Sequence, residues 1–74
     1  MTPDELGYLL KHNHRVECMK DGYRVEVSMS YKENIWVLIH DKPERVWIQR
    51  KGLRRMVDLM LTYAPIADWK EVSR

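Results

Sequence analysis

Five cationic side chains gather in the chain where a last helix is predicted to begin. They lie within eleven residues: Arg45, Arg50, Lys51, Arg54 and Arg55. Cations at a helix N-terminus oppose the macrodipole, which favours acidic residues there. A bound anion would relieve this repulsion, because free backbone N–H groups and guanidinium groups would converge on it. The run predicts contact with phosphate groups or an acidic protein. The alternative is a solvated basic face, partly neutralised by Glu44 and Asp58.

Two tryptophans and a leucine form the second candidate binding surface. The strand register derived below places Trp36, Leu38 and Trp47 on the sheet face that the helices leave uncovered. Exposed apolar patches mark interaction sites, and tryptophan is enriched in binding hot spots. We expect a partner-protein interface, a homodimer interface or base stacking on nucleic acid, unless residues 66–72 fold back and cover the patch.

Catalytic side chains are few. The same register places His40 opposite Glu26 with Ser28 on the diagonal, so a Ser/His/Glu group can be drawn. Nucleophilic catalysis also requires an oxyanion hole and a concave, dry site. A flat sheet surface without a glycine-rich turn supplies neither, and an ion pair across the strands is the ordinary explanation. We therefore expect a protein that is not an enzyme.

The residue types that bind soft metals are limited to four side chains: His12, His14, Cys18 and His40. His14 and Cys18 share the predicted core face, whereas His40 points to the other face, so no tetrahedral site is predicted. Cys18 is expected to be buried among valines, where a thiol behaves as a small, inert hydrophobe. We expect neither a metal ion nor a cofactor.

The size and composition of the chain indicate one small domain. It has 74 residues and a formal charge of +2, from 13 Lys and Arg against 11 Asp and Glu. A single cysteine cannot form an intramolecular disulfide, which favours a reducing compartment. The first residues lack the basic and apolar regions of a signal peptide, and no apolar run approaches the ~20 residues of a membrane span. These features predict a cytoplasmic protein without membrane contact.

Two helices are predicted, one at each end of the chain. The first begins at a capping-box sequence, Thr2-Pro3-Asp4-Glu5, and covers about residues 3–12. The second begins near Arg50 and ends near Tyr63, because Pro65 disfavours helical geometry at the residue before it. Apolar residues then recur every third position: Ile66, Trp69 and Val72. They form either a last turn that folds back or a tail that orders on binding.

Four stretches of alternating apolar and polar residues separate the helices. They cover residues 14–20, 23–31, 35–40 and 45–49. The Asp-Gly pair after the first stretch predicts a two-residue hairpin turn, which pairs Val16 with Val27. On the polar face this hairpin forms a charge ladder from Arg15, Glu17, Arg24 and Glu26. The next turn is predicted at residues 32–34, which pairs Val37 with Met29.

These elements predict an α+β fold of order αββββα, a four-stranded antiparallel meander with both helices on one face. The covered face is expected to carry the apolar residues Val16, Cys18, Tyr23, Val25, Val27, Met29, Ile35, Val37, Ile39, Val46 and Ile48. Residues 1–64 are expected to form the compact domain. Residues 65–74 are expected to form a C-terminal tail that can fold back on the sheet.

The order helix, sheet, helix in about seventy residues, with a basic start to the second helix, resembles double-stranded RNA-binding domains. It is also similar to the related small toxin ribonucleases of bacterial toxin–antitoxin pairs. The resemblance is one of topology. Those domains typically have three strands, and their loop motifs and a glycine-serine-histidine element are not found in this chain.

The sequence therefore predicts a small non-enzymatic binding module for an anionic partner. The partner is a nucleic acid backbone or an acidic protein surface, bound through the basic helix start and the Trp-bearing face. One alternative is a protein-binding inhibitor or adaptor of the phage or mobile-element type, acting through the Trp face. A small toxin-like nuclease using His40 with Glu26 is the third hypothesis. A homodimer through either edge strand, 14–20 or 45–49, also fits the pattern.

Overall fold

Helix α1 spans Pro3–Lys11 in the computed structural model, which describes residues 1–72 of the chain. Its start confirms the predicted capping box. Glu5 N donates to Thr2 Oγ1 at 3.2 Å, and Thr2 N donates to Glu5 Oε1 at 3.3 Å. After the helix, Asn13 has a positive φ of 64°, a left-handed conformation that asparagine tolerates and that commonly ends helices.

Strands β1 (Val16–Lys20) and β2 (Tyr23–Ser30) form the predicted hairpin. Both residues of the Asp-Gly turn between them have positive φ, 55° and 81°, as a type I′ turn requires. The predicted register is confirmed, because Val16 pairs with Val27. The turn thus determines which side chains of this hairpin face the core.

The second turn differs from the prediction. Strand β3 spans Ile35–His40, and its first residue pairs with Ser30 instead of Tyr31. Four residues connect the two strands where three were predicted, and the last of them, Asn34, has a φ of 55°. Because side chains alternate along a strand, a shift of one residue moves every side chain of β3 to the other face.

Because of this shift, each side chain of β3 lies on the opposite face of the sheet from the one predicted. Trp36, Leu38 and His40 lie on the face covered by the helices, opposite Met29, Val27 and Val25 respectively. Ile35, Val37 and Ile39 lie on the open face, so their predicted assignment to the core face is wrong.

Strand β4 (Val46–Arg50) forms one edge of a sheet with the order β4-β3-β2-β1-β5. Its facing agrees with the prediction. Ile48 lies opposite Leu38 on the helix side, and Trp47 lies opposite Ile39 on the open face. The four predicted strands therefore form the predicted meander, and a short fifth strand extends it.

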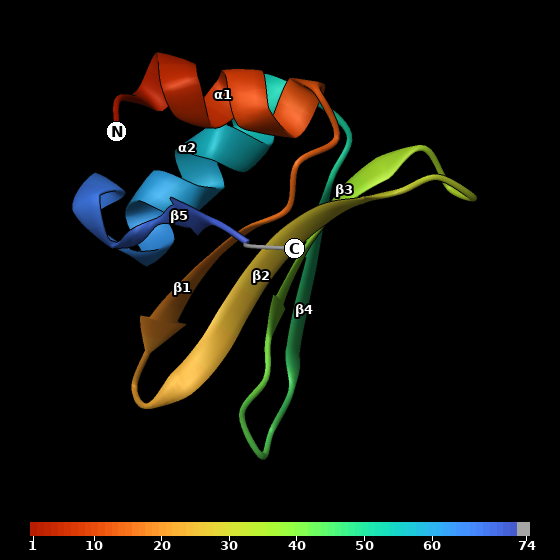
Figure 1. Cartoon of the computed structure of the whole chain (residues 1–74). Helices are drawn as coiled ribbons and strands as arrows, with labels where there is room; N and C mark the ends of the chain where they lie inside the picture. The colour runs from red at the N-terminus through yellow and green to blue at the C-terminus, as the bar shows by residue number, and fades with distance from the viewer. Residues whose placement is uncertain (73–74) are drawn as a thin grey trace.

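Helix α2 spans Leu53–Tyr63 and ends before Pro65, as predicted. A 3₁₀ turn η1 (Ile66–Asp68) and a two-residue strand β5 (Lys70–Glu71) follow, and β5 pairs with β1. The chain after α2 thus returns to the β1 edge of the sheet (Figure 1). The last two residues of the predicted tail, 73–74, lie outside the described residues.

One hydrophobic core lies between the sheet and the two helices, which cover the same face as predicted (Figure 1). Helix α1 contacts β1, and α2 contacts β3 and β4. The fully buried core side chains include Leu6, Leu10, Val16, Val25, Val27, Leu38, Met56 and Met60. Tyr23, which the prediction placed among them, is exposed. Neither helix of the described chain is long and apolar enough to cross a membrane.

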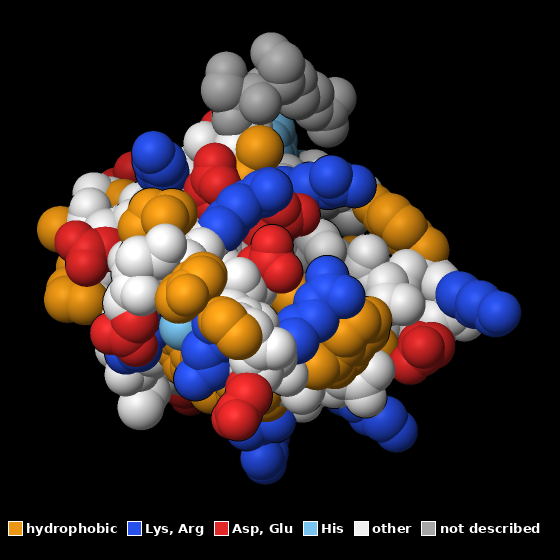
Figure 2. All heavy atoms as spheres, turned by 90° about the horizontal axis from the view of Figure 1, so that it is seen from below, with side chains coloured by type: hydrophobic (Ala, Val, Ile, Leu, Met, Phe, Trp, Pro, Cys, Tyr) orange, Lys and Arg blue, Asp and Glu red, His pale blue; other side chains and the backbone are white. Residues whose placement is uncertain are grey.

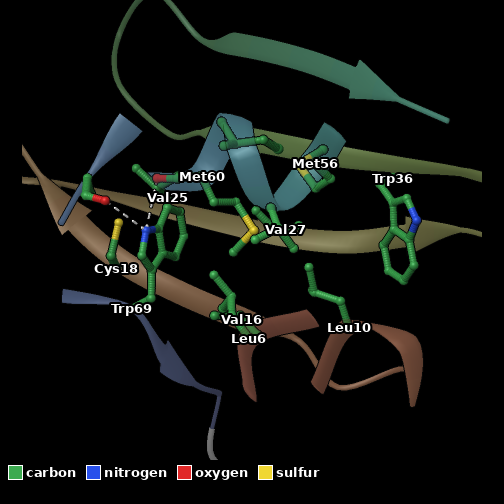
Figure 3. Close-up of a cluster of buried hydrophobic side chains, with 13 residues drawn as sticks. Leu6, Leu10, Val16, Cys18, Val25, Val27, Trp36, Met56, Met60 and Trp69 are labelled. Atoms are coloured by element: carbon green, nitrogen blue, oxygen red, sulfur yellow. Dashed lines mark hydrogen bonds between the residues drawn. The ribbon is translucent and has the colours of Figure 1, made fainter. Parts of the chain in front are cut away.

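Trp69 joins this core from the C-terminal segment. Its indole is 2% exposed, and Nε1–H donates to the carbonyl oxygens of Met60 and Ala64, at 3.1 and 3.2 Å (Figure 3). The Met60 carbonyl also accepts from the Ala64 N–H, whereas the Ala64 carbonyl lies past the last turn of the helix and takes the indole as its donor. His14 Nδ1 and Glu71 Oε2, 2.5 Å apart, also hold β5 to the residues before β1. Through Ile66 and Trp69 the described part of this segment packs on the helix side of the sheet.

Candidate binding surface

The start of α2 carries no group that neutralises its positive end. Its N-cap is Gly52, which offers no side chain as a hydrogen-bond acceptor, and its first turn contains no acidic residue. The first backbone N–H groups of the helix therefore lack a capping acceptor. Arg54 and Arg55 add positive charge in the same turn. An anion is the ligand that such a helix start favours.

Four of the five predicted cations surround this helix start: Arg50, Lys51, Arg54 and Arg55. We call these four residues the basic helix start. On one side of α2 is a hollow of about 330 Å³, lined by Arg50, Arg55, Asp58, Leu59 and Thr62. Arg54 lines a different groove, of about 350 Å³, which lies between α1 and α2 and also includes Lys11 and Tyr8. The cations thus spread around the helix end instead of forming one pocket.

Arg45 is not part of this group, so the expectation that all five cations gather at the helix start is wrong. It comes before β4, whereas Arg50 is the last residue of that strand. A strand advances roughly 3.3 Å per residue, which separates the two arginines by roughly 17 Å. Arg45 therefore lies at the far end of the sheet edge.

The ion pairs of residues 1–72 lie away from the basic helix start. Arg24 Nε lies 2.9 Å from Glu17 Oε2, and Arg24 also pairs with Glu26. Arg15 Nε lies 3.9 Å from Glu26 Oε1, which completes the predicted charge ladder on the open face. Acidic and basic side chains also alternate beside hydrophobic ones across the lower side of the molecule (Figure 2). Among the described residues, no carboxylate lies at ion-pair distance from the basic helix start.

The predicted patch of Trp36, Leu38 and Trp47 does not form. Trp36 is 6% exposed and Leu38 is fully buried, because the register shift turns both into the core. Figure 3 shows Trp36 and Trp69 at opposite ends of the core. Trp47 alone remains on the open face, 55% exposed. Its apolar neighbours there are Ile39, directly opposite, and the buried Val37.

His40 belongs to a buried polar cluster that sequence reasoning missed. It is 1% exposed, and its Nε2 donates to the carbonyl oxygen of Lys20 at 2.9 Å. Its other ring nitrogen, Nδ1, is hydrogen-bonded to the Tyr63 hydroxyl, 2.7 Å away. Lys20 Nζ donates to the Tyr63 carbonyl at 2.6 Å. The cluster connects the end of α2 to the β1–β2 hairpin and to β3. No local sequence motif predicts it.

The predicted Ser/His/Glu group is not brought together. Glu26 and Ser28 lie on the open face, whereas His40 lies on the helix side, opposite Val25. The prediction of this group depended on the incorrect β3 register. The part of the chain that the structure describes also contains no group of three His, Cys, Asp or Glu residues placed to hold a metal ion.

Cys18 is buried in the core, as predicted. Burial raises the pKa of its thiol from the ordinary 9.0 to about 11, and the negative charge of Asp68 contributes in the same direction. Burial also raises the pKa of the Tyr63 hydroxyl, with a further contribution from the charge of Asp21. Both groups are held in their neutral forms by the fold.

The free energy of unfolding should fall as the pH rises from 9.0 toward about 11. In this window the unfolded chain releases the Cys18 proton while the folded chain keeps it, so rising pH favours the unfolded state. Tyr63 acts in the same direction at higher pH. Urea unfolding at several pH values should show that the free energy of unfolding declines less with rising pH in Cys18→Val than in the wild type. Equal declines would contradict a buried, neutral thiol.

Comparison with known proteins gives no further assignment: no family model, no curated protein and no solved structure matches this chain. The predicted topological resemblance to double-stranded RNA-binding domains and toxin ribonucleases gains no support from these comparisons.

Proposed function

We propose that this protein is a small non-enzymatic binding module that docks on an anionic partner through the basic helix start. One observation carries the proposal: four cations surround an uncapped helix N-terminus, and no described carboxylate pairs with them. The arginines of the open face differ, because glutamates already neutralise them. Free positive charge is therefore concentrated where backbone N–H groups are also unsatisfied.

An acidic protein surface is the partner we favour. Sequence-tolerant binding of single-stranded nucleic acid relies on aromatic side chains on which successive bases stack. With Trp36 in the core, the exposed aromatic side chains of the described surface are Trp47 on β4, Tyr8 on α1, Tyr23 on β2 and Tyr31 in the β2–β3 connection, so they are spread over four parts of the fold. Tryptophan and arginine are both enriched in protein-binding hot spots, and Trp47 and Arg50 lie on the same edge strand. A nucleic acid backbone is the second candidate, because phosphate groups would satisfy the same cations.

The inhibitor and nuclease hypotheses rest on different residues. An inhibitor or adaptor acting through the open face would depend on Trp47 and Ile39, the exposed and half-buried apolar groups there. A toxin-like nuclease would need His40 accessible, but both of its ring nitrogens are hydrogen-bonded inside the protein. His40 is therefore not available as the catalytic side chain that the nuclease hypothesis requires.

Arg54→Glu combined with Arg55→Glu should weaken binding to labelled polyglutamate by about tenfold or more, because both changes reverse charge at the helix start. The matched control is Lys42→Glu with Arg45→Glu, which reverses the same number of charges at the far end of β4 and should have little effect. Fluorescence anisotropy between about 50 and 200 mM salt provides the measurement. A labelled DNA duplex and a labelled RNA duplex serve as the nucleic acid probes.

The probes separate the two partner classes. Binding of polyglutamate with weak duplex binding supports an acidic protein, and the reverse order supports a nucleic acid. Equal loss of binding in the double variant and its control would show only a general charge effect. That result, or no binding to any probe at low salt, would contradict the proposed function.

A further inference from the structure

The outer edge of β4 has no partner strand in the described chain. The sheet order β4-β3-β2-β1-β5 leaves β4 at one end, while β5 covers part of the β1 edge at the other. An unpaired edge presents a row of backbone N–H and C=O groups that can pair with another extended chain. In an antiparallel strand only alternate residues direct their backbone N–H and C=O groups to the outer side, so part of Val46–Arg50 is available for such pairing. One outer carbonyl, that of Gln49, also accepts from Arg50 Nη1 at 2.7 Å, a contact that an added strand would replace.

Different side chains flank this edge on its two sides. On the open face Trp47 is 55% exposed, and it provides an apolar surface next to the backbone. On the helix side, the hollow at the end of β4 is bounded by Arg50 from the strand and by Arg55, Asp58, Leu59 and Thr62 from α2, two cations against one carboxylate. A strand added to β4 would direct alternate side chains toward these two surfaces. One set would meet the indole and the other would meet guanidinium groups.

We propose that the outer edge of β4 pairs with an extended segment of the partner protein in which acidic and apolar residues alternate. This inference rests on the proposed function, because it identifies the anionic partner as a protein strand. Backbone hydrogen bonds supply the affinity in strand addition, and the alternating side chains supply the specificity. Acidic side chains match Arg50 and Arg55, which form no ion pair with a described residue, while apolar ones match Trp47.

A second copy of the chain fits this edge less well. If all five residues of β4 paired with their copies in antiparallel fashion, the two-fold axis would pass through Ile48. Arg50 would then lie opposite Val46 of the second copy, and Arg45 opposite its Lys51. Like charges directly opposite one another destabilise a strand pair. Cations at a strand edge also discourage self-association in natural sheets.

The experiment uses the full chain and three labelled probes. The first is a capped octapeptide of alternating Glu and Val. The second has the same composition in the order Glu-Glu-Val-Val, and the third is polyglutamate of the same length. The alternating peptide should bind at least about tenfold more tightly than the other two, because it alone presents its charges on one side of a strand. Amide hydrogen exchange in β4 should slow on its addition by about tenfold or more.

Variants test the two flanking surfaces separately. Trp47→Ala should weaken the alternating peptide several-fold, because it removes the apolar surface on the open side of the edge. Tyr31→Ala is the matched control, because Tyr31 is also an exposed aromatic residue but lies in the β2–β3 connection. Arg50→Glu with Arg55→Glu should weaken the alternating peptide at least about tenfold.

Failure of this inference is distinguishable from failure of the proposed function. Equal affinity for all three probes without slowed exchange in β4 would overturn strand pairing while leaving the basic helix start as an anion site. No binding of any probe would overturn both. A dimer by light scattering, with β4 amides protected before any peptide is added, would assign the edge to a second copy and overturn the proposed occupant.

Discussion

Replacing Trp36 by alanine should lower the free energy of unfolding by about 3–5 kcal/mol, whereas the same change at Trp47 should lower it by less than about 1 kcal/mol. Trp36 is 6% exposed and packs at one end of the core, so its removal leaves a cavity that the neighbouring side chains fill only in part. Trp47 is mostly solvated, and its removal leaves no cavity. Urea unfolding followed by circular dichroism measures both values.

The loss expected for Trp36→Ala is large compared with the total free energy of unfolding, so a milder variant is also needed. A chain of 74 residues is expected to have a free energy of unfolding of about 4–11 kcal/mol. Trp36→Ala therefore threatens folding altogether, so Trp36→Phe, which keeps an aromatic ring, provides a second measurement with a smaller loss. A larger loss at Trp47 than at Trp36 would show that β3 has the register with Trp36 on the open face.

The two turns explain why the sequence predicted one strand register and not the other. Asp-Gly between alternating stretches specifies a two-residue type I′ turn, and this alone aligns β1 with β2. The sequence between β2 and β3 contains no glycine, and it is compatible with a connection of either three or four residues. The hydrophobic pattern of β3 does not determine its register against β2, because the strand is apolar on both faces: Ile35, Trp36, Val37, Leu38 and Ile39. Turn length then determines the facing, and sequence alone did not provide it.

The candidate site was predictable where it is local and unpredictable where it depends on the sheet. Arg54 and Arg55 follow closely after Gly52, so their place in the first turn of α2 could be read from the chain. Arg45 is close in sequence, but an intervening strand carries it to the far end of the sheet. His40 and Tyr63 are 23 residues apart and meet only because β3 turns His40 toward α2.

The segment after α2 was predictable as apolar but not as part of the core. Its apolar residues recur every third position, which fits both a docked turn and a solvated tail. The decisive contact is the indole of Trp69, whose N–H reaches two carbonyl groups at the end of α2. No pattern in the sequence encodes a side chain capping a helix from a later segment.

Trp69→Ala should lower the free energy of unfolding by about 3–5 kcal/mol, comparable to the effect of Trp36→Ala. It removes a side chain that is 2% exposed, and it also leaves the Ala64 carbonyl without its indole donor, while the Met60 carbonyl keeps the Ala64 N–H. Trp69→Phe separates these contributions, because phenylalanine fills much of the volume but has no N–H. It should cost about 1–3 kcal/mol for the unsatisfied Ala64 carbonyl, with a small packing loss added.

Lys70→Ala is the matched control for Trp69, because Lys70 is the neighbouring residue and is exposed. Its removal should change the free energy of unfolding by less than about 0.5 kcal/mol. A chain ending at Ala64 should be destabilised at least as much as Trp69→Ala, since it also loses β5 and the His14–Glu71 contact. If this shortened chain unfolds at the same urea concentration as the full chain, Trp69 contributes nothing to the core, and residues 1–64 fold independently of the segment that follows.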